Sequence, residues 1–257
     1  MTATTLYPSL RHKVVFITGG ATGIGAAMVR AFAAQQAHVA FIDIDEAAAV
    51  SLLAELRGNG HGGRHLWFRM VDVRTPALLQ QAMHDAAAEL GGLDVLVNNV
   101  ANDRRQPTAE VSVTDWQQCM QVNLDPAFFA SQTAATLMPA QGQGSIINFS
   151  SINALTGQQQ MAGYVTAKAA IMGLTKALAK DYGAAGIRVN AILPGWVATD
   201  RQLSSWFTAQ EQQNWLDTAV LKRLITPQDV ANLALFLASD QSALITGQAI
   251  CVDGGRA

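Results

Sequence analysis

Short apolar runs alternate with longer alanine-rich segments along the first hundred residues. The runs VVFIT, VAFID and DVLVN lack polar alternation, which is typical of strands covered on both faces in a parallel sheet. The pattern predicts strands at 14–18, 38–43, 66–71 and 93–98, and helices at 26–36, 46–57 and 76–90. This order favours an α/β fold with a single doubly wound, Rossmann-type, mostly parallel sheet and helices on both faces.

The second half of the chain continues the same alternation. Helices are expected at 114–138 and 162–184, strands at 145–149 and 188–193, and a final helix after Thr226 followed by a last strand. No repeat, low-complexity stretch or Pro/Ser-rich linker divides the chain. Residues 1–257 are therefore expected to form one domain.

One interval, 198–221, interrupts this order. It is polar, rich in glutamine, and carries Trp206, Phe207 and Trp215. We expect an inserted helical excursion over a sheet edge, where lids that cover a substrate commonly lie. A packed pair of surface helices is the alternative interpretation.

Composition excludes several classes of protein. Half of the residues are hydrophobic, 14% are charged, and the net charge is −2, which excludes intrinsic disorder and gives no basic footprint for nucleic acid. No apolar run reaches the roughly 18 residues that a membrane span requires. Neither a nucleic acid nor a membrane is therefore expected as a partner.

The cysteines and the N-terminus bear on the compartment. Cys119 and Cys251 are too few for a disulfide framework, lack metal-ligand spacing and are interpreted as buried thiols, so no metal is expected. The first ten residues lack a basic segment followed by an apolar stretch. These features favour a reducing, cytoplasmic location.

A glycine-rich turn follows the first predicted strand. In TGGATGIG, residues 18–25, the glycines are Gly19, Gly23 and Gly25, and the motif opens the first helix. Bare backbone amides at a helix N-terminus can hold a pyrophosphate, and glycines allow it to approach closely. The spacing is wider than in the usual dinucleotide fingerprint, so a purely structural turn remains an alternative.

An acidic residue at the end of the second strand indicates the cofactor. Asp43 lies 18 residues after Gly25, near the spacing of about 20 expected for a carboxylate that bonds ribose hydroxyls. Ala21, Thr22 and Ile44 offer no arginine for a 2′-phosphate, so NAD is favoured over NADP. The alternative, Asp43 as a helix N-cap, is less favoured because Asp45 is better placed for that role.

Two further strand ends carry polar residues. Asp72 and Val73 follow the third strand and could hold the adenine edge, although Asp72 could equally cap the next helix. Asn98 and Asn99 end the fourth strand, at the carboxyl edge where ligands bind in open α/β sheets. For one of this pair, turn geometry is an equally good explanation.

A possible proton-transfer site involves Ser151, Tyr164 and Lys168. Tyr164 and Lys168 are four residues apart on a predicted helix and share one face. A tyrosine base near neutral pH needs its pKa lowered by about three units, or roughly 4 kcal/mol. A positive charge about 4 Å away supplies energy of that order, so Lys168 with an oxidised nicotinamide is sufficient. An exposed tyrosine beside a solvated lysine is the alternative for this pair alone.

Taken together, these motifs resemble the short-chain dehydrogenase/reductase family over nearly the whole chain. The resemblance is carried by TGGATGIG, Asp43, NNVA, Asn123, Ser151, Tyr164-Val-Thr-Ala-Lys168 and Val189-Asn190-Ala-Ile-Leu-Pro194-Gly195. Ser151 precedes Tyr164 by 13 residues, which is the family's catalytic spacing. The family more often has NNAG, and the Val100-Ala101 pair here narrows backbone freedom beside the substrate pocket.

The resemblance implies a dinucleotide-binding catalytic domain and a role for each matching residue. Tyr164 would be the acid/base, Ser151 would orient the substrate oxygen, Lys168 would hold ribose and tune Tyr164, and Asn123 would complete a water-linked proton relay. The residues implied to bind NAD, besides Tyr164 and Lys168, are Gly19, Thr22, Gly23, Ile24, Gly25, Asp43, Asp72, Val73, Asn99, Pro194, Gly195, Val197 and Thr199. The terminal ITGQAICVDGG resembles a strand that often forms homotetramer contacts.

Three short segments look similar to sugar dehydrogenases that oxidise aldoses at the anomeric carbon: YPSL, NNVAND-R and LKR-I-TP. The substrate would contact Asn102, Asp103, Arg104, Ser151, Asn153 and Tyr164. The expected reaction is NAD-dependent oxidation of a pentose, hexose or 6-deoxyhexose, such as xylose, arabinose, galactose or fucose, to the aldonolactone. A solvated charged loop is the alternative for residues 102–104. Alternative functions are a secondary-alcohol or polyol dehydrogenase, a 3-oxo reductase, and a non-catalytic NAD-binding regulator.

Overall fold

A parallel sheet of seven strands forms the centre of the computed structural model, which describes residues 5–58, 66–138 and 143–257. The strand order is β3-β2-β1-β4-β5-β6-β7, and every pairing is parallel. The strands are β1 (Val14–Thr18), β2 (His38–Asp43), β3 (Leu66–Met70), β4 (Val95–Asn98), β5 (Gly144–Phe149), β6 (Ile187–Pro194) and β7 (Ala249–Val252). The expected doubly wound α/β fold is confirmed.

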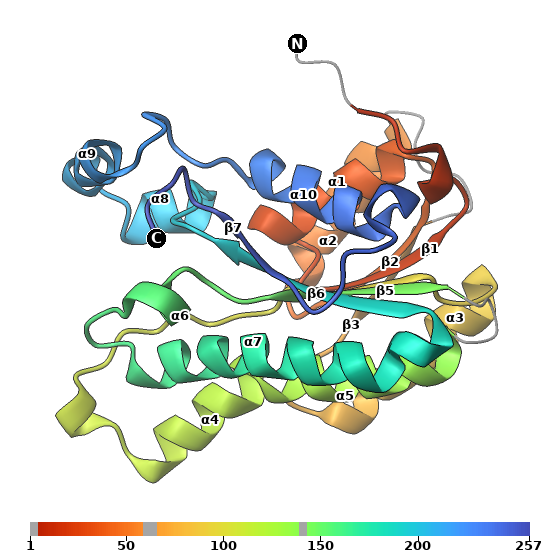
Figure 1. The fold of residues 1–257 in the computed structure, drawn as a ribbon, viewed down its shortest axis with the longest axis horizontal. Coiled ribbons are helices and arrows are strands. Elements are labelled where there is room, and N and C mark those ends of the chain that lie inside the picture. Colours follow the sequence, from red (N-terminus) through yellow and green to blue (C-terminus); the bar gives the residue numbers. More distant parts are fainter. Residues whose placement is uncertain (1–4, 59–65, 139–142) are drawn as a thin grey trace.

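Helices cover both faces of this sheet (Figure 1). One face carries α1 (Gly23–Ala34), α2 (Glu46–Gly58) and α10 (Pro227–Ala238), which share an apolar core with the strands. The other carries α3 (Pro76–Leu90), α4 (Val113–Asn123), α5 (Asp125–Leu137) and α7 (Ala162–Tyr182). The remaining helices are α6 (Asn153–Thr156), α8 (Asp200–Ser205) and α9 (Ala209–Thr218). Burial on both faces explains why the strands lack polar alternation.

The strand order reverses between β1 and β4, which positions the site. Thr18 at the end of β1 pairs in register with Ile42 of β2 and with Asn98 of β4. The carboxyl ends of these three strands therefore meet at one edge. In open α/β sheets, ligands bind in the crevice outside such a switch point.

The single helix expected over 114–138 is wrong, because the chain forms two helices there. Leu124 leaves the helical conformation, with φ −128° and ψ −56°, between α4 and α5. Pro126 lies in the first turn of α5, where its missing N–H costs no hydrogen bond. The break leaves Asn123 as the last residue of α4.

The interval 198–221 forms two short helices, α8 and α9, and its expected role of covering a substrate stays a prediction. Phe207 and Trp215 are buried in the core on the α1 face. Figure 1 shows both helices beyond the end of β6, on the side that also holds the C-terminus. The excursion is thus packed onto the fold through aromatic side chains, which the alternative interpretation also predicted.

The interpretation of both cysteines as buried is wrong for Cys251. Its side chain is exposed, whereas that of Cys119 is half-buried. Cys251 lies on β7, the last strand of the sheet, where no further strand covers it. Separately, none of the helices in the described ranges is long and apolar enough to cross a membrane.

Candidate active site

The glycine-rich turn joins β1 to α1 in a conformation that side chains would block. Gly19 and Gly23 have φ of 69° and 52°, in the left-handed region that favours glycine. A Cβ at Gly25 would lie 1.8 Å from the Gly19 carbonyl oxygen. Thr22 is the N-cap of α1 but makes no side-chain capping bond. The first-turn amides of α1 therefore remain open to a phosphate.

Asp43 ties this turn to the end of β2. Its Oδ2 accepts a hydrogen bond from Ala21 N at 2.9 Å, and its Oδ1 accepts one from Ile44 N at 2.8 Å. Asp45 Oδ1 accepts one from Ala48 N at 2.9 Å, in the helix-capping position expected of it. Asp43 thus lies beside the glycine-rich turn, and neither position 21 nor position 44 is an arginine.

Asp72 is paired with a neighbouring arginine. Arg74 donates to both oxygens of the Asp72 carboxylate and holds the pKa of that group below its usual value. Val73 is buried. The prediction that these residues hold an adenine therefore depends on a carboxylate that already has a partner.

The two asparagines at the end of β4 point in different directions. Asn99 Nδ2 donates to Thr18 O at 3.1 Å and to Gly19 O at 2.9 Å, so this side chain fixes the start of the glycine turn. Asn98 Nδ2 donates to Asn148 Oδ1 at 2.9 Å in the buried interior. Only Asn99 therefore faces the expected cofactor site.

The segment after β6 approaches the same turn from the other side. A Cβ at Gly23 would lie 3.2 Å from Thr199 Cγ2, and one at Gly195 would lie 2.5 Å from the Trp215 ring. Val197 is buried and pairs with Ile225 through an isolated parallel backbone β-bridge. The structure thus brings residues 194–199 next to the glycine-rich turn. A dinucleotide fits these residues because open amides, glycines and a carboxylate face one crevice.

Ser151, Tyr164 and Lys168 meet at the carboxyl end of β5. Ser151 lies just beyond β5 and hydrogen-bonds the half-buried Tyr164 hydroxyl from there. Lys168, buried to 2% exposure, donates from Nζ to Phe149 O at 2.8 Å. Its Nζ lies 5.7 Å from the centroid of the Tyr164 ring. The predicted proton-transfer group is therefore assembled.

Burial dominates the electrostatics of this group. Desolvation raises the pKa of Tyr164 to about 12, although the hydrogen bond from Ser151 acts in the opposite direction. Desolvation also lowers the pKa of Lys168 to about 8. A tyrosine that acts as a base near neutral pH needs a lowered pKa, and the groups of this chain do not by themselves lower the pKa of Tyr164. That shift needs a further positive charge, such as an oxidised nicotinamide.

Asn123 holds the loop that follows β4. Its Oδ1 accepts from Asn102 N at 2.8 Å, and its Nδ2 donates to Asn102 O at 3.1 Å and Cys119 O at 3.0 Å. The side chain is 3% exposed. Asn123 therefore fixes the backbone of the loop, and its expected place in a proton relay stays a prediction.

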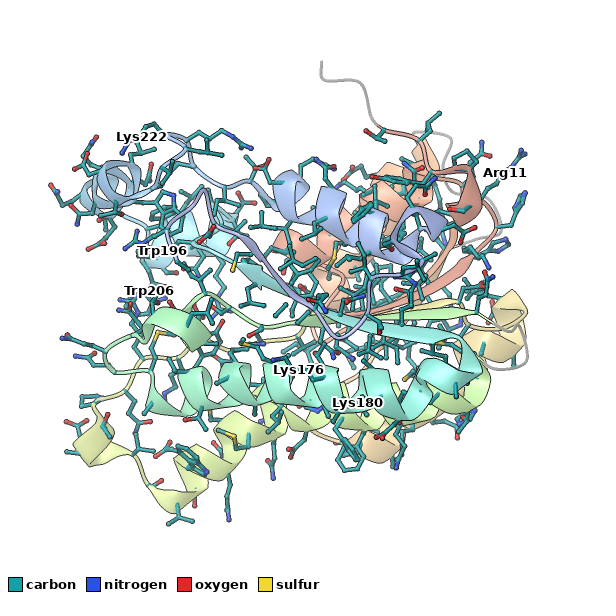
Figure 2. The ribbon with its side chains drawn as sticks, viewed as in Figure 1. Arg11, Lys176, Lys180, Trp196, Trp206 and Lys222 are labelled. Carbon is teal, nitrogen blue, oxygen red and sulfur yellow. The ribbon has the colours of Figure 1, made fainter. Side chains whose placement is uncertain are left out.

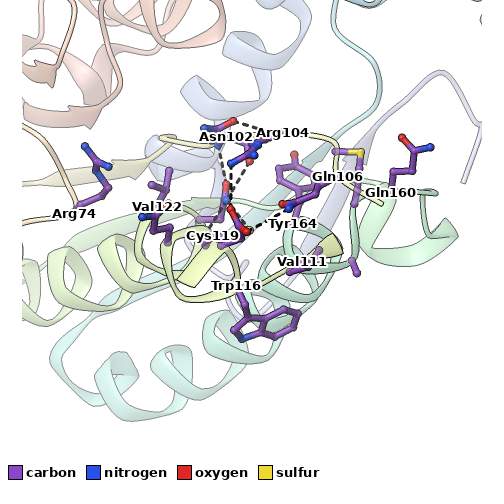
Figure 3. A pocket seen from close by; sticks show the side chains of 16 residues that line it. Arg74, Asn102, Arg104, Gln106, Val111, Trp116, Cys119, Val122, Gln160 and Tyr164 are labelled. Carbon is purple, nitrogen blue, oxygen red and sulfur yellow. Dashed lines mark hydrogen bonds and ion pairs between the residues drawn. The ribbon is translucent and has the colours of Figure 1, made fainter. Parts of the chain in front are cut away.

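The predicted substrate residues do not all share one surface. Asn102 and Arg104 line a cavity that also contains Tyr164 and Asn123 (Figure 3). Asp103 instead bonds residues of α8. Asn153 begins α6 and donates from its backbone N–H to Ser151 Oγ at 3.2 Å.

The structure adds residues that sequence reasoning did not select. Arg74, Gln106, Asp115, Gln118 and Gln160 add to the polar lining of the cavity. Arg201 and Gln202 of α8 contact Asp103 across 98 and 99 residues of chain. No local motif marks contacts of this separation, although the polar character of 198–221 was a signal. Among the residues described, no group of three His, Cys, Asp or Glu could hold a metal ion.

Comparison with known proteins extends this description. A family model described as enoyl-(acyl carrier protein) reductase matches residues 19–257. A probable galactose dehydrogenase from Rhizobium meliloti is 43% identical over 97% of this chain and 96% of that protein. D-xylose 1-dehydrogenase from Caulobacter vibrioides is 40% identical over 97% of this chain and 98% of that protein.

One similar solved structure is a 7α-hydroxysteroid dehydrogenase complexed with NADH and 7-oxo glycochenodeoxycholic acid. It is 33% identical, has a TM-score of 0.91, and the match covers 97% of this chain and 96% of that one. Proteins named for free sugars and for a steroid therefore resemble this chain along almost its entire length.

Proposed function

The chain belongs to the short-chain dehydrogenase/reductase family, and from this premise we propose that it oxidises a free aldose at C1 to the aldonolactone with NAD. As a member of this family it is an oxidoreductase that acts on CH–OH groups. The observation that carries the sugar assignment is the cavity that the polar side chains of Asn102, Arg104 and Tyr164 help to line. A sugar needs such fixed donors and acceptors around its hydroxyl groups. The likeness to galactose and xylose dehydrogenases supports the same substrate class.

The residues of the chain would divide the chemistry as follows. Tyr164 takes the proton of the anomeric hydroxyl, while Ser151, hydrogen-bonded to Tyr164, holds the same oxygen. Lys168 keeps a positive charge close to the tyrosine ring. The hydride acceptor for C1 would be supplied by bound NAD. Loss of one hydride and one proton converts the C1 hydroxyl to the lactone carbonyl.

The choice of NAD over NADP rests on Asp43. One similar solved structure is complexed with NADH. In this chain a carboxylate stands beside the phosphate turn, where the added phosphate of NADP would meet like charge. The backbone bonds from Ala21 and Ile44 hold that carboxylate in position.

Assembly and location stay predictions alongside this function. We propose a homotetramer, a single catalytic domain over 1–257 and a cytoplasmic location. The exposed edge strand β7, with Cys251 outward, is consistent with a surface that pairs with another subunit. Light scattering of the purified protein with and without NAD measures the oligomeric state directly.

A substrate screen tests the function. NAD and NADP reduction is followed with pentoses, hexoses, 6-deoxyhexoses, polyols and secondary alcohols, and the product is identified by mass and by hydrolysis. We expect the highest kcat/KM with an aldose and NAD, and an aldonic acid after hydrolysis. A ketose product, or preference for a polyol such as an alditol, assigns the chain to the alternative dehydrogenases. Turnover only in the reverse direction with a 3-oxo compound assigns it to the reductases, and NAD binding without any turnover to the regulators.

A further inference from the structure

Side chains with no assigned role in catalysis or cofactor binding join two walls of the candidate site. Loop 100–107 follows β4, and segment 196–207 follows β6 and includes α8. We call the contacts between these walls the bridge. Its members are Asp103 and Arg105 from the loop, and Trp196, Arg201, Gln202 and Trp206 from the segment.

The polar half of the bridge is centred on Asp103. Its Oδ1 accepts a hydrogen bond from Arg201 Nη2 at 2.9 Å, and its Oδ2 accepts one from Gln202 Nε2 at 2.8 Å. Gln202 Oε1 in turn accepts from Trp196 Nε1 at 2.8 Å. Each carboxylate oxygen of Asp103 is therefore held by a different residue of α8.

The aromatic half is centred on Arg105. Its guanidinium carbon lies 4.9 Å from the ring centroid of Trp206 and 5.7 Å from that of Trp196, within the range of cation–π attraction. Trp196 also stacks on Phe207 at 4.4 Å, and Phe207 is completely buried. Trp196 and Trp206 lie at the same end of the molecule (Figure 2). The aromatic half thus connects the loop to a fixed point of the core.

The bridge lies close to the reacting groups. The charges of Asp103 and Arg201 both act on Tyr164, and they shift its pKa in opposite directions. Thr199, the N-cap of α8, lies against Gly23 of the phosphate turn. Asn102, next to Asp103, is fixed by Asn123. The side chains that cross between the walls therefore do so close to both Tyr164 and the cofactor turn.

Building on the proposed aldose dehydrogenase function, we propose that the bridge sets the upper size limit of the substrate. It admits a free monosaccharide and excludes a sugar that carries a second ring. A monosaccharide needs the bridge to open only for entry. The exposed Arg201–Asp103 pair alone is weak, whereas the ion pair, the Gln202 hydrogen bond and the two cation–π contacts together resist being held open. A second ring would keep the bridge open throughout hydride transfer, so its cost appears in the transition state of the larger substrate alone.

A size determinant outside the reacting groups is needed in this family. Similar proteins are named for galactose, for xylose and for a hydroxysteroid, which are molecules of very different size. In this chain the bridge is a feature of side chains on the two walls rather than of the reacting centre. It can therefore change substrate size without changing the chemistry.

The test compares sugars that share the same reacting C1. Wild-type kcat/KM is measured for D-galactose against 4-galactobiose, D-xylose against xylobiose, and D-glucose against lactose. Each disaccharide carries the corresponding monosaccharide at its reducing end. We expect each accepted monosaccharide to exceed its disaccharide by about a hundredfold or more.

The variant that opens the bridge is Arg105→Gln with Arg201→Gln, which removes the positive charge of each half and leaves Asp103 in place. We expect it to narrow the ratio of monosaccharide to disaccharide by at least about tenfold. Trp206→Ala removes only an exposed ring from Arg105 and should narrow the ratio by a smaller factor. Lys222→Gln removes an exposed cation beyond α9 that bonds Asp217 O, and should leave the ratio unchanged. Circular dichroism and NAD affinity establish that each variant is folded.

The outcomes separate the size limit from the proposed function. Failure of the wild type to oxidise any aldose overturns the proposed function, and the size limit falls with it. Oxidation of monosaccharides and disaccharides at similar kcat/KM overturns the size limit alone. The same holds if folded Trp206→Ala and the double variant keep the wild-type ratio. A double variant that fails to fold leaves the wild-type ratio and Trp206→Ala to decide the question.

Discussion

The two halves of the active site are built in different ways. On the cofactor half, backbone atoms make the decisive contacts: Gly19 O accepts a hydrogen bond from Asn99 Nδ2, and Ala21 N donates one to Asp43 Oδ2. On the substrate half, side chains meet side chains from distant segments, as Asp103 does with Arg201 and Gln202. The first half resists substitution because its spacing leaves no room, whereas the second depends on pairs of side chains that must be changed together.

The difference teaches where cofactor and substrate specificity reside. A phosphate turn needs glycines and open amides, so its sequence is nearly determined by its geometry. A sugar site needs only some set of donors and acceptors at suitable distances. Four substitutions test this contrast.

The largest expected effect is at the junction of the two halves. Tyr164→Phe removes the hydroxyl that Ser151 bonds while leaving the ring in place. We expect kcat to fall by about 100- to 10,000-fold, as for loss of a positioned acid/base, with little change in NAD affinity. Tyr182→Phe, at the end of the same helix, is the matched control and should retain activity. Substantial turnover by the Tyr164 variant would show that another group moves the proton.

A smaller effect is expected within the cofactor half. Gly25→Ala places a Cβ 1.8 Å from the Gly19 carbonyl oxygen, so the turn must shift. We expect the Kd for NAD, measured by titration calorimetry, to rise by about 100-fold, or about 2.7 kcal/mol. Gly173→Ala adds a Cβ that meets nothing within 4 Å and should bind NAD normally. Normal binding by both variants would mean that the turn is not the phosphate site.

Replacing one carboxylate on the cofactor half should change cofactor preference. Asp43→Ala removes the negative charge beside the glycine turn and the bond from Ala21 N. We expect the ratio of kcat/KM for NAD to that for NADP to fall by about tenfold, because repulsion of the 2′-phosphate is relieved. Asp45→Ala loses only a helix cap, at a cost of about 1 kcal/mol in stability, and should keep the ratio. An unchanged ratio in the Asp43 variant would remove its ribose role.

The smallest effect concerns stability and its dependence on pH. Burial lowers the pKa of Lys168 to about 8 from an ordinary value of 10.5. The folded state therefore binds this proton less tightly than the unfolded state, so the ammonium destabilises the fold below pH 8. As pH rises from 8 towards 10.5, this destabilisation is lost. Lys168→Met should gain about 1 kcal/mol at pH 7, and the difference should shrink above pH 8.

Thermal unfolding of wild type and variant across this pH range measures that difference. Lys176→Met, an exposed position on the same helix, serves as the control and should follow the wild-type pH dependence. A stability difference that is constant from pH 7 to 10 would contradict the sign of the Lys168 shift. The Lys168 variant should also bind NAD more weakly, because the ammonium is expected to serve both the ribose and Tyr164.

The contrast between the halves also explains what could be predicted from the sequence. Hydrophobic runs locate β1, β2 and β4 because strands buried on both faces leave no polar positions. Helix α1 starts at Gly23, earlier than expected. The hydrophobic pattern missed its first turn because that turn contains glycines, which carry no apolar side chain. The break at Leu124 was missed because α4 and α5 are nearly continuous in sequence.

On the substrate half, the sequence indicated candidate residues but not the partners that hold them. The loop 102–104 was selected for its polar side chains, yet whether Asp103 faces the cavity or α8 depends on tertiary packing. Residues 98 positions apart share no local pattern, so Arg201 could not be assigned to Asp103. The pKa of Tyr164 likewise depends on how deeply the helix is buried, which spacing alone does not state.

The contact of Asp103 with α8 has a consequence for protein engineering. Loop grafting usually treats each loop of a scaffold as an independent module. Here a grafted 100–107 loop without Asp103 would leave Arg201 and Gln202 of the host without their acceptor. A grafted 196–207 segment would likewise leave Arg105 without its two indole rings. Donor segments for the two walls should therefore be taken from the same parent and transplanted together.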